Sequence, residues 1–92
     1  MDREWYVYLL ECKSKRIYSG VTPDLDKRLQ AHAKGKGALF TKINAPEKLL
    51  AAKAFPSQRQ ALQIERQIKK MPAQSKRILA DVWSREQVIE DV

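Results

Sequence analysis

Residues 5–22, WYVYLLECKSKRIYSGVT, decide the fold of this chain. The run from Trp5 to Cys12 opens with aromatic and β-branched residues and is too short for a helix. It is followed by a polar turn, Lys13 to Lys15, and then by a second strand-like run from Arg16 to Thr22. The stretch therefore predicts two strands joined as an antiparallel hairpin.

The length of the turn decides which side chains meet across this hairpin. Successive side chains of a strand point to opposite faces of the sheet. A three-residue loop, Lys13 to Lys15, pairs Tyr8 with Gly20 and puts Tyr8 and Tyr18 on one face. A two-residue loop, Ser14-Lys15, puts the two tyrosines on opposite faces. The residue pattern leaves both alternatives open.

Capping and breaking residues divide the rest of the chain. Asp24 suits a helix N-cap or first turn, Ser57 opens a Ser-x-x-Gln capping box, and Ser84 opens a second one. The stretch between Pro46 and Pro56 is short enough to predict a third strand. The predicted elements after the hairpin are a helix through residue 33, a strand over 47–55, a helix from 57 that ends before residue 72, a helix over about 74–83 and a short helix from 84.

The resulting order, ββαβααα, predicts an α+β fold in which a small antiparallel three-stranded sheet is flanked by helices. With 92 residues the chain is long enough for one domain with a thin core. We expect that domain to span residues 1–92, with its core over about 5–76 and C-terminal helices over 74–91.

The charge of the chain indicates a polyanionic partner. Eighteen Lys and Arg residues against eleven Asp and Glu give a net charge of +7, which favours nucleic acid. The basic residues are scattered over several segments, which argues against binding to a membrane surface. Cys12 is the single cysteine, and the first apolar run is too short for a signal peptide or a membrane span. These features predict a cytoplasmic protein, with association with the nucleoid as an option.

The stretch ALQIERQIKK, residues 61–70, carries a carboxylate on an apolar helix face. Leu62 and Ile68 belong to a series with three- and four-residue spacing, and Glu65 falls inside the same arc. A buried ionised acid costs several kcal/mol unless it is paired or binds a metal. Two interpretations stand: an ion pair with Arg28 or a helix neighbour, or a metal ligand.

Other polar residues each have a structural interpretation when taken singly. Tyrosines in strands usually serve packing, and a lone histidine beside leucines, such as His32, is usually a satisfied core residue. Arg28 stands four residues before His32 and shares its helix face. Gly20 inside a strand indicates a bulge or a close backbone approach, unless it is a simple strand end.

Together these residues resemble the GIY-YIG nuclease superfamily. Its two short motifs correspond here to Tyr6-Val7-Tyr8 and Tyr18-Ser19-Gly20, followed by Arg28 and His32 on the next helix and Glu65 on a later one. The stretch HAKGKGALFT, residues 32–41, is similar to the small stand-alone, single-domain bacterial branch. The resemblance runs over about residues 5–76.

Two departures from the family pattern lie in the motifs. Tyr6 and Val7 replace Gly and Ile in the first motif, and Ser19 replaces Ile in the second. The motif members that are expected to act in catalysis, Tyr8, Tyr18 and Gly20, are kept.

The resemblance implies a metal-dependent DNA endonuclease that hydrolyses phosphodiester bonds, in DNA repair or recombination. With no added recognition module, we expect selectivity for DNA shape, such as branches or nicks, over sequence. The alternative of the same fold is a catalytically inactive module that binds DNA or structured RNA. A protein-interaction domain with a basic face is a further rival.

The family also implies roles for the site residues. Glu65 is expected to hold one divalent ion, Mg²⁺ or Mn²⁺, and Arg28 a phosphate oxygen. Tyr8 is expected to act as base, with help from His32 or Tyr18, once the metal and Arg28 favour its phenolate. Gly20 and Thr41 are supporting residues. The residues expected to contact nucleic-acid phosphates are Lys34, Lys36, Lys42, Arg66, Lys69 and Lys70.

Overall fold

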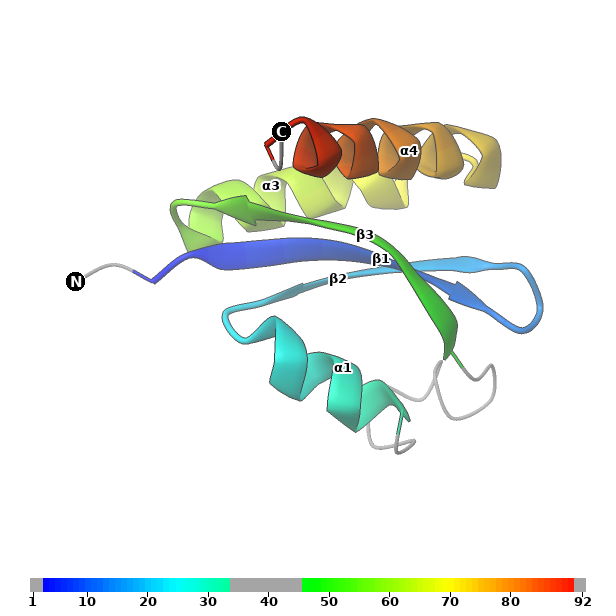
Figure 1. The fold of residues 1–92 in the computed structure, drawn as a ribbon, viewed down its shortest axis with the longest axis horizontal. Helices are drawn as coiled ribbons and strands as arrows, with labels where there is room; N and C mark the ends of the chain where they lie inside the picture. The colour runs from blue at the N-terminus through cyan, green and yellow to red at the C-terminus, as the bar shows by residue number, and fades with distance from the viewer. Residues whose placement is uncertain (1–2, 34–45, 91–92) are drawn as a thin grey trace.

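The computed structural model describes residues 3–33 and 46–90 (Figure 1). The sheet has the strand order β2-β1-β3, and both neighbouring pairs are antiparallel. The predicted α+β class with a three-stranded antiparallel sheet is therefore confirmed. The elements are β1 (Trp5–Cys12), β2 (Ile17–Thr22), α1 (Leu25–Ala33), β3 (Pro46–Phe55), α3 (Gln58–Lys69) and α4 (Ala73–Glu90).

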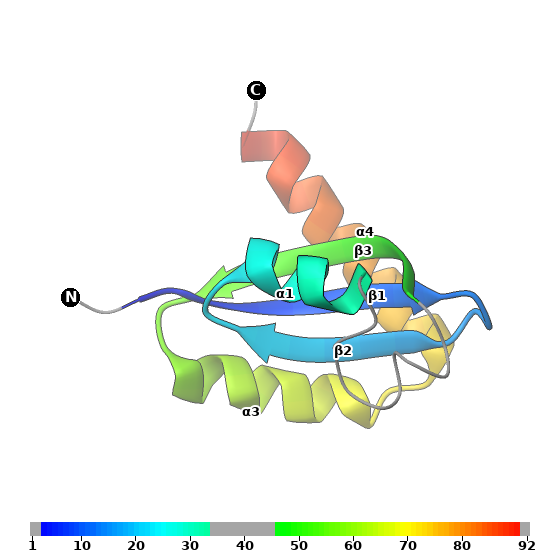
Figure 2. The same cartoon turned by 90° about the horizontal axis from the view of Figure 1, so that it is seen from below.

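Helices cover both faces of the sheet. Figure 1 shows α3 and α4 on one face and α1 on the other. In Figure 2, α3 runs alongside β2, while α4 crosses behind β3. Since β2 is an edge strand of the sheet, α3 lies along that edge.

The alternation of side chains along β1 builds two apolar clusters. Val7 and Leu9 are fully buried in the cluster that also contains Ile68 of α3 and Trp83 of α4. Tyr8 and Leu10 point the other way, into a smaller cluster against which residues of α1 pack. The tyrosine face of the hairpin is thus the face that α1 covers.

The turn of the hairpin has three residues. The Cys12 amide donates to the Arg16 carbonyl at 2.9 Å, and the Lys15 amide donates to the Cys12 carbonyl at 2.8 Å. Lys15 has a φ of 73°, the left-handed conformation that such a turn requires at its last residue. Tyr8 accordingly pairs with Gly20. Of the two turn lengths that the sequence allowed, the longer one is present.

Gly20 provides the space that the Tyr8 ring fills. A Cβ atom at Gly20 would collide with the Tyr8 hydroxyl and would lie 2.5 Å from Tyr8 Cζ. Gly20 is neither a strand end nor a bulge, because it lies inside β2 and its pairing with Tyr8 is regular. The close approach is that of the phenol ring across the strand.

The predicted caps of α1 and α3 are present. Asp24 Oδ1 accepts from the Lys27 amide at 3.1 Å, and Thr22 Oγ1 accepts from the Asp24 amide at 3.1 Å. Ser57 has an extended backbone, and its Oγ accepts from the Gln60 amide at 3.2 Å. The first pair of bonds joins the end of β2 to the start of α1 and so fixes where α1 lies.

The two helices predicted at the C-terminal end are wrong, because α4 is one continuous helix over Ala73–Glu90. Ser84 does not act as a cap. Its Oγ donates to the Leu50 carbonyl of β3 at 3.2 Å. The preceding Trp83 is buried and lies 6.4 Å from the Phe55 ring between centroids. Packing on β3 therefore carries the helix through the second capping box, and the described residues contain one helix fewer than the predicted order.

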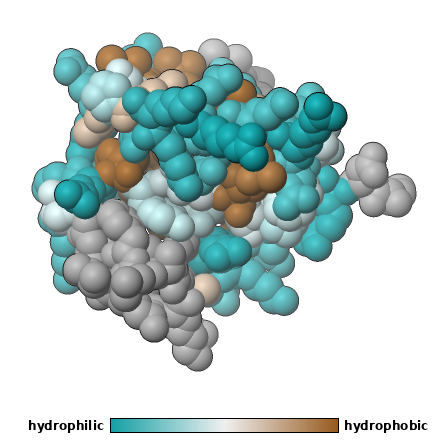
Figure 3. All heavy atoms as spheres, turned by 180° about the vertical axis from the view of Figure 1, so that it is seen from behind, coloured by the Kyte–Doolittle hydropathy of each residue, from teal (hydrophilic) through white to brown (hydrophobic). Residues whose placement is uncertain are grey.

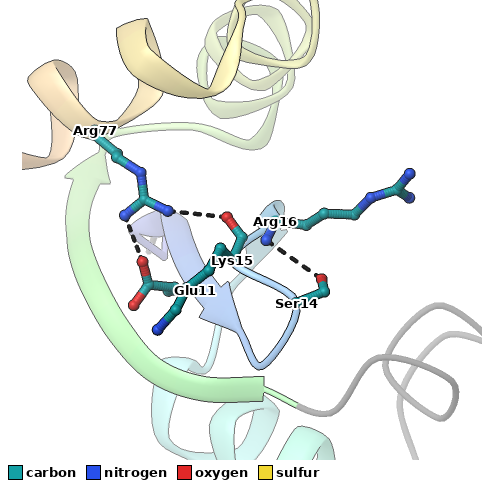
Figure 4. A network of polar contacts seen from close by, with 5 residues as sticks. All are labelled: Glu11, Ser14, Lys15, Arg16 and Arg77. Carbon is teal, nitrogen blue, oxygen red and sulfur yellow. Dashed lines mark hydrogen bonds and ion pairs between the residues drawn. The ribbon is translucent and has the colours of Figure 1, made fainter.

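A polar network ties α4 to the hairpin turn (Figure 4). Arg77 of α4 donates to the buried Glu11 carboxylate of β1 and forms an ion pair with it. Its second nitrogen donates to the Lys15 carbonyl at 2.9 Å. One guanidinium thus holds both the end of β1 and the turn residue with positive φ.

The face of the molecule in Figure 3 is mainly hydrophilic, and its hydrophobic residues form separate patches. The large hydrophobic residues exposed in the described chain are Leu49, Ile78 and Val82. Among the helices of residues 3–33 and 46–90, none is long and apolar enough to cross a bilayer.

The space at Gly20 predicts the effect of adding one methyl group. We expect Gly20→Ala to lower the free energy of unfolding by about 1–3 kcal/mol, because the Tyr8 ring must leave its place. In a Tyr8→Leu background, which lacks the phenol, the same substitution should cost less. A double-mutant cycle of urea unfolding measures the difference. Equal costs in both backgrounds would contradict the account of Gly20.

The Glu11–Arg77 pair predicts a dependence of stability on pH. The hydrogen bond from Arg77 lowers the pKa of Glu11 below its ordinary value of 4.5. The folded state therefore gains stability above that pH and loses it as the pH falls through the lowered pKa. The melting temperatures of the wild type and of Glu11→Gln should differ at pH 6 and converge on acidification.

The matched control is Glu86→Gln, which removes a carboxylate from the more exposed pair with Lys53. Its melting temperature should stay close to that of the wild type at every pH. If Glu11→Gln melted with the same pH dependence as the wild type, the Arg77 contact would not stabilise the turn.

Candidate active site

Tyr8 belongs to the smaller apolar cluster on the α1 side of the sheet, and charged residues of two helices act on its hydroxyl. Its side chain is 1% exposed, and its ring centroid lies 6.4 Å from that of Tyr18. The hydroxyl extends from the central strand β1 over Gly20 of β2, the edge strand along which α3 runs.

Arg28 comes to this cluster from α1. Leu25 and Leu29 pack on the cluster that contains Tyr8, and Arg28 stands beside them on the exposed part of the helix. Its charge acts on the Tyr8 hydroxyl, whose pKa it lowers. The guanidinium is therefore a solvent-facing cation at the rim of a buried phenol.

The pKa of Tyr8 is raised well above its ordinary value of 10.0. Burial is the largest cause, and the neighbouring Tyr18 and the negative charge of Glu65 raise the pKa further. Arg28 alone opposes them. In the protein by itself, burial therefore outweighs the effect of Arg28 on the pKa of Tyr8. That a bound metal together with Arg28 favours the phenolate stays a prediction.

Glu65 lies on α3, where it is one of three buried residues, and its charge acts on Tyr8 from there. Its side chain is 11% exposed, and its Oε2 lies 3.4 Å from the ammonium of Lys69, one turn further along the helix. The ion pair is therefore with the helix neighbour, not with Arg28. The Lys69 side chain is 61% exposed, so its ammonium is largely hydrated while it pairs with Glu65.

The residues around Glu65 fit a site for one hard cation. Within residues 3–33 and 46–90, no three His, Cys, Asp or Glu residues gather as a cluster. Magnesium is commonly held by one or two carboxylates, with water and substrate phosphate as the other ligands. A nearly buried carboxylate whose recorded partner is an exposed, movable lysine matches that donor set.

The remaining predicted residues divide between described and undescribed parts of the chain. His32 belongs to the last turn of α1, but its side chain lies outside the described residues. Arg66, Lys69 and Lys70 are exposed on or next to α3. The predicted residues that lie outside the described ranges are Lys34, Lys36, Thr41 and Lys42.

Sequence reasoning kept open an ion pair of Glu65 with a helix neighbour but did not identify that neighbour as Lys69, which it assigned to nucleic acid. The signal was present, because a lysine four residues after a glutamate on a helix is within reach of its carboxylate. It also missed Arg77, whose partners are 66 and 62 residues away. No local pattern could have indicated those contacts.

Comparison with known proteins identifies the family. The model of the GIY-YIG catalytic domain matches residues 4–77. The UPF0213 protein Reut_B5558 of Cupriavidus pinatubonensis is 42% identical over 76 residues, which are 83% of this chain and 84% of that protein. The UPF0213 protein BH0048 of Halalkalibacterium halodurans is 42% identical over 77 residues, which are 84% of this chain and 82% of that protein.

A solved structure agrees with these relatives. The solution NMR structure of the UPF0213 protein BH0048 from Bacillus halodurans has a TM-score of 0.55 and 40% sequence identity to this chain. The match covers 86% of this chain and 84% of the other. The family model, the curated relatives and the fold point the same way: the chain belongs to the family of GIY-YIG catalytic domains, among small UPF0213 proteins.

Proposed function

We propose that this protein is a metal-dependent DNA endonuclease that hydrolyses phosphodiester bonds. The observation that supports this most is the convergence on Tyr8: charges from two different helices, Arg28 of α1 and Glu65 of α3, act on its hydroxyl together with Tyr18. A buried phenol on which both a cation and a carboxylate act is an arrangement that packing alone does not need.

Arg28 is proposed to bind the phosphate. Its guanidinium is always charged, is exposed beside the cluster, and can donate two parallel hydrogen bonds to phosphate oxygens. The same donors can stabilise the additional negative charge that develops on the phosphorus oxygens during attack.

Tyr8 is proposed to orient the attacking water and to take its proton. In hydrolysis the water oxygen bonds to phosphorus, the bond from phosphorus to one sugar oxygen breaks, the attacking water loses a proton, and the departing sugar oxygen takes up a proton from solvent water. Tyr8 can accept that proton only as phenolate, which Arg28 favours and the charge of Glu65 opposes. Neutralisation of the Glu65 charge would therefore favour the phenolate of Tyr8, which can accept the proton with assistance from His32 or Tyr18.

Glu65 is proposed to hold the divalent ion, Mg²⁺ or Mn²⁺. When bound, such an ion supplies positive charge for the phosphate and for the leaving oxygen. Lys69 is released from Glu65 at small cost, because its side chain is already largely in water. Its charge then becomes available to a phosphate.

Affinity is proposed to come from charge outside the site. Contacts of lysines and arginines with the phosphate backbone of DNA carry no information about the bases. The shape of the DNA would therefore outweigh its sequence for a chain of 92 residues. Branched or nicked DNA, in cytoplasmic repair or recombination, is the proposed setting, with residues 1–92 as one nuclease domain and Gly20 and Thr41 in support. The phosphate contacts are assigned to Lys34, Lys36, Lys42, Arg66, Lys69 and Lys70.

The raised pKa of Tyr8 favours one second candidate. A site that never generates a phenolate would leave a nucleic-acid-binding module of the same fold, specific for DNA or structured RNA and without turnover. Cleavage of DNA by the wild type with Mg²⁺ or Mn²⁺, and its loss in chelator, separates the two candidates.

Substitution of Glu65 tests the proposed function, because it should leave the stability of the fold nearly unchanged and abolish cleavage. Glu65→Gln leaves Lys69 exposed and hydrated, so the free energy of unfolding should change by less than about 1 kcal/mol. Metal-dependent nicking of plasmid DNA should be abolished. DNA binding should persist or tighten, because one negative charge near the phosphates is gone. Thermal melts with and without Mg²⁺, together with a nicking assay, measure both.

Glu86→Gln is the matched control, since Glu86 is also paired with a lysine, at 3.1 Å, but lies on α4. This variant should cut DNA at the normal rate. A Glu65→Gln protein that melts many degrees lower, or that still cuts, would remove Glu65 from the proposed site.

A further inference from the structure

A groove along α3 shares one residue, Arg66, with the phosphate contacts assigned above, and its other lining residues have no role there. Its volume is about 430 Å³, and its lining residues are Gln58, Arg59, Leu62, Gln63 and Arg66. Both arginines and both glutamines are exposed. The volume is within the range of sites for small ligands, and the lining combines two cations, two amides and one apolar side chain.

Leu62 is the unexpected member of this groove. Its spacing predicted a place in the core, but the buried residues of α3 are Ala61, Glu65 and Ile68. Leu62 is half-buried and is not among the residues that pack against either apolar cluster of the described chain. An apolar surface is therefore presented between two arginines.

The groove begins beside the proposed metal ligand. Gln58, Leu62, Glu65 and Lys69 follow one another at four-, three- and four-residue spacing, so they form one stripe along α3. Leu62 lies about 4.5 Å from Glu65 along the helix axis, at about 1.5 Å per residue. A strand whose phosphate is held at Glu65 can thus continue directly into the groove.

We propose that this groove binds one unpaired nucleotide of the substrate, next to the phosphate that is cleaved. The inference rests on the proposed function for the position of that phosphate. Leu62 contacts the face of the base or sugar, the two glutamines bond to its polar edge, and Arg59 and Arg66 hold the flanking phosphates. In a duplex the faces of a base are covered by stacking, so the groove selects DNA that is single-stranded or splayed at the cleavage site.

Binding measured in chelator tests the groove without any cleavage. The probes are fluorescent (dT)12 and a 20-base-pair duplex, compared by anisotropy at one salt concentration. Leu62→Gln changes no charge and should weaken (dT)12 binding at least about fivefold, with less than about twofold change for the duplex. Leu62→Trp adds a stacking surface and should tighten (dT)12 binding selectively. Circular dichroism checks that both variants are folded.

A matched pair of charge variants separates the groove from general electrostatics. Arg59→Ala with Arg66→Ala, and Lys13→Ala with Arg16→Ala at the hairpin turn, each remove two positive charges. Figure 4 shows the Arg16 side chain extending away from the network at the turn. The α3 pair should weaken (dT)12 binding several times more than the turn pair.

Two results would overturn the proposal: an unchanged ratio of (dT)12 to duplex affinity in both Leu62 variants, or equal weakening by the two charge pairs. Failure of the proposed function is a different result. If the wild type cut no DNA with Mg²⁺ or Mn²⁺ but the Leu62 variants shifted the ratio, the groove would stand and the nuclease assignment would fall.

Discussion

The pairing of Tyr8 with Gly20 across the hairpin is the constraint on which the rest of the molecule depends. Because side chains alternate along a strand, a slip of one residue would turn Tyr18 toward α3 and α4, away from Tyr8. Glycine is the residue at that position that leaves room for the phenol. The register is set by a turn whose last residue, Lys15, has a strained backbone that Arg77 holds from the other end of the chain.

Once the phenol of Tyr8 lies over β2, the charges that act on it come from the helices on the two faces of the sheet. α1 contributes an exposed cation, α3 contributes a buried carboxylate, and burial keeps the proton on Tyr8 between them. Glu65 in turn is neutralised by Lys69, a partner that remains in water. Because the Lys69 side chain is already largely in water, its release from Glu65 to a phosphate would cost little.

Local signals predicted most of the fold. The hairpin strands, the third strand between two prolines, and the caps at Asp24 and Ser57 depend on neighbours in sequence, and all are present. The turn length stayed open because the local residues fit both lengths, and the contact of Arg77 with the Lys15 carbonyl comes from far away in the chain. The second capping box failed since Ser84 finds its partner on β3.

Of the candidate site, the sequence predicted the features that depend on helical spacing and not those that depend on distant parts of the chain. The buried position of Glu65 followed from helical spacing, because that spacing reports the helix face. Leu62 followed the same spacing but is only half-buried and lines the groove along α3. The state of Tyr8 could not be predicted, since its pKa depends on burial by α1 and on charges from two helices.

The most direct test of the central claim, that Glu65 holds a divalent ion near Tyr8 and Gly20, is paramagnetic broadening by Mn²⁺ in amide NMR spectra of the protein. The account predicts that the signals of Gly20 and of the α3 residues around Glu65 broaden first, and that Glu65→Gln abolishes this pattern. Broadening centred on another carboxylate, such as Glu86, or a pattern that survives in Glu65→Gln, would contradict it.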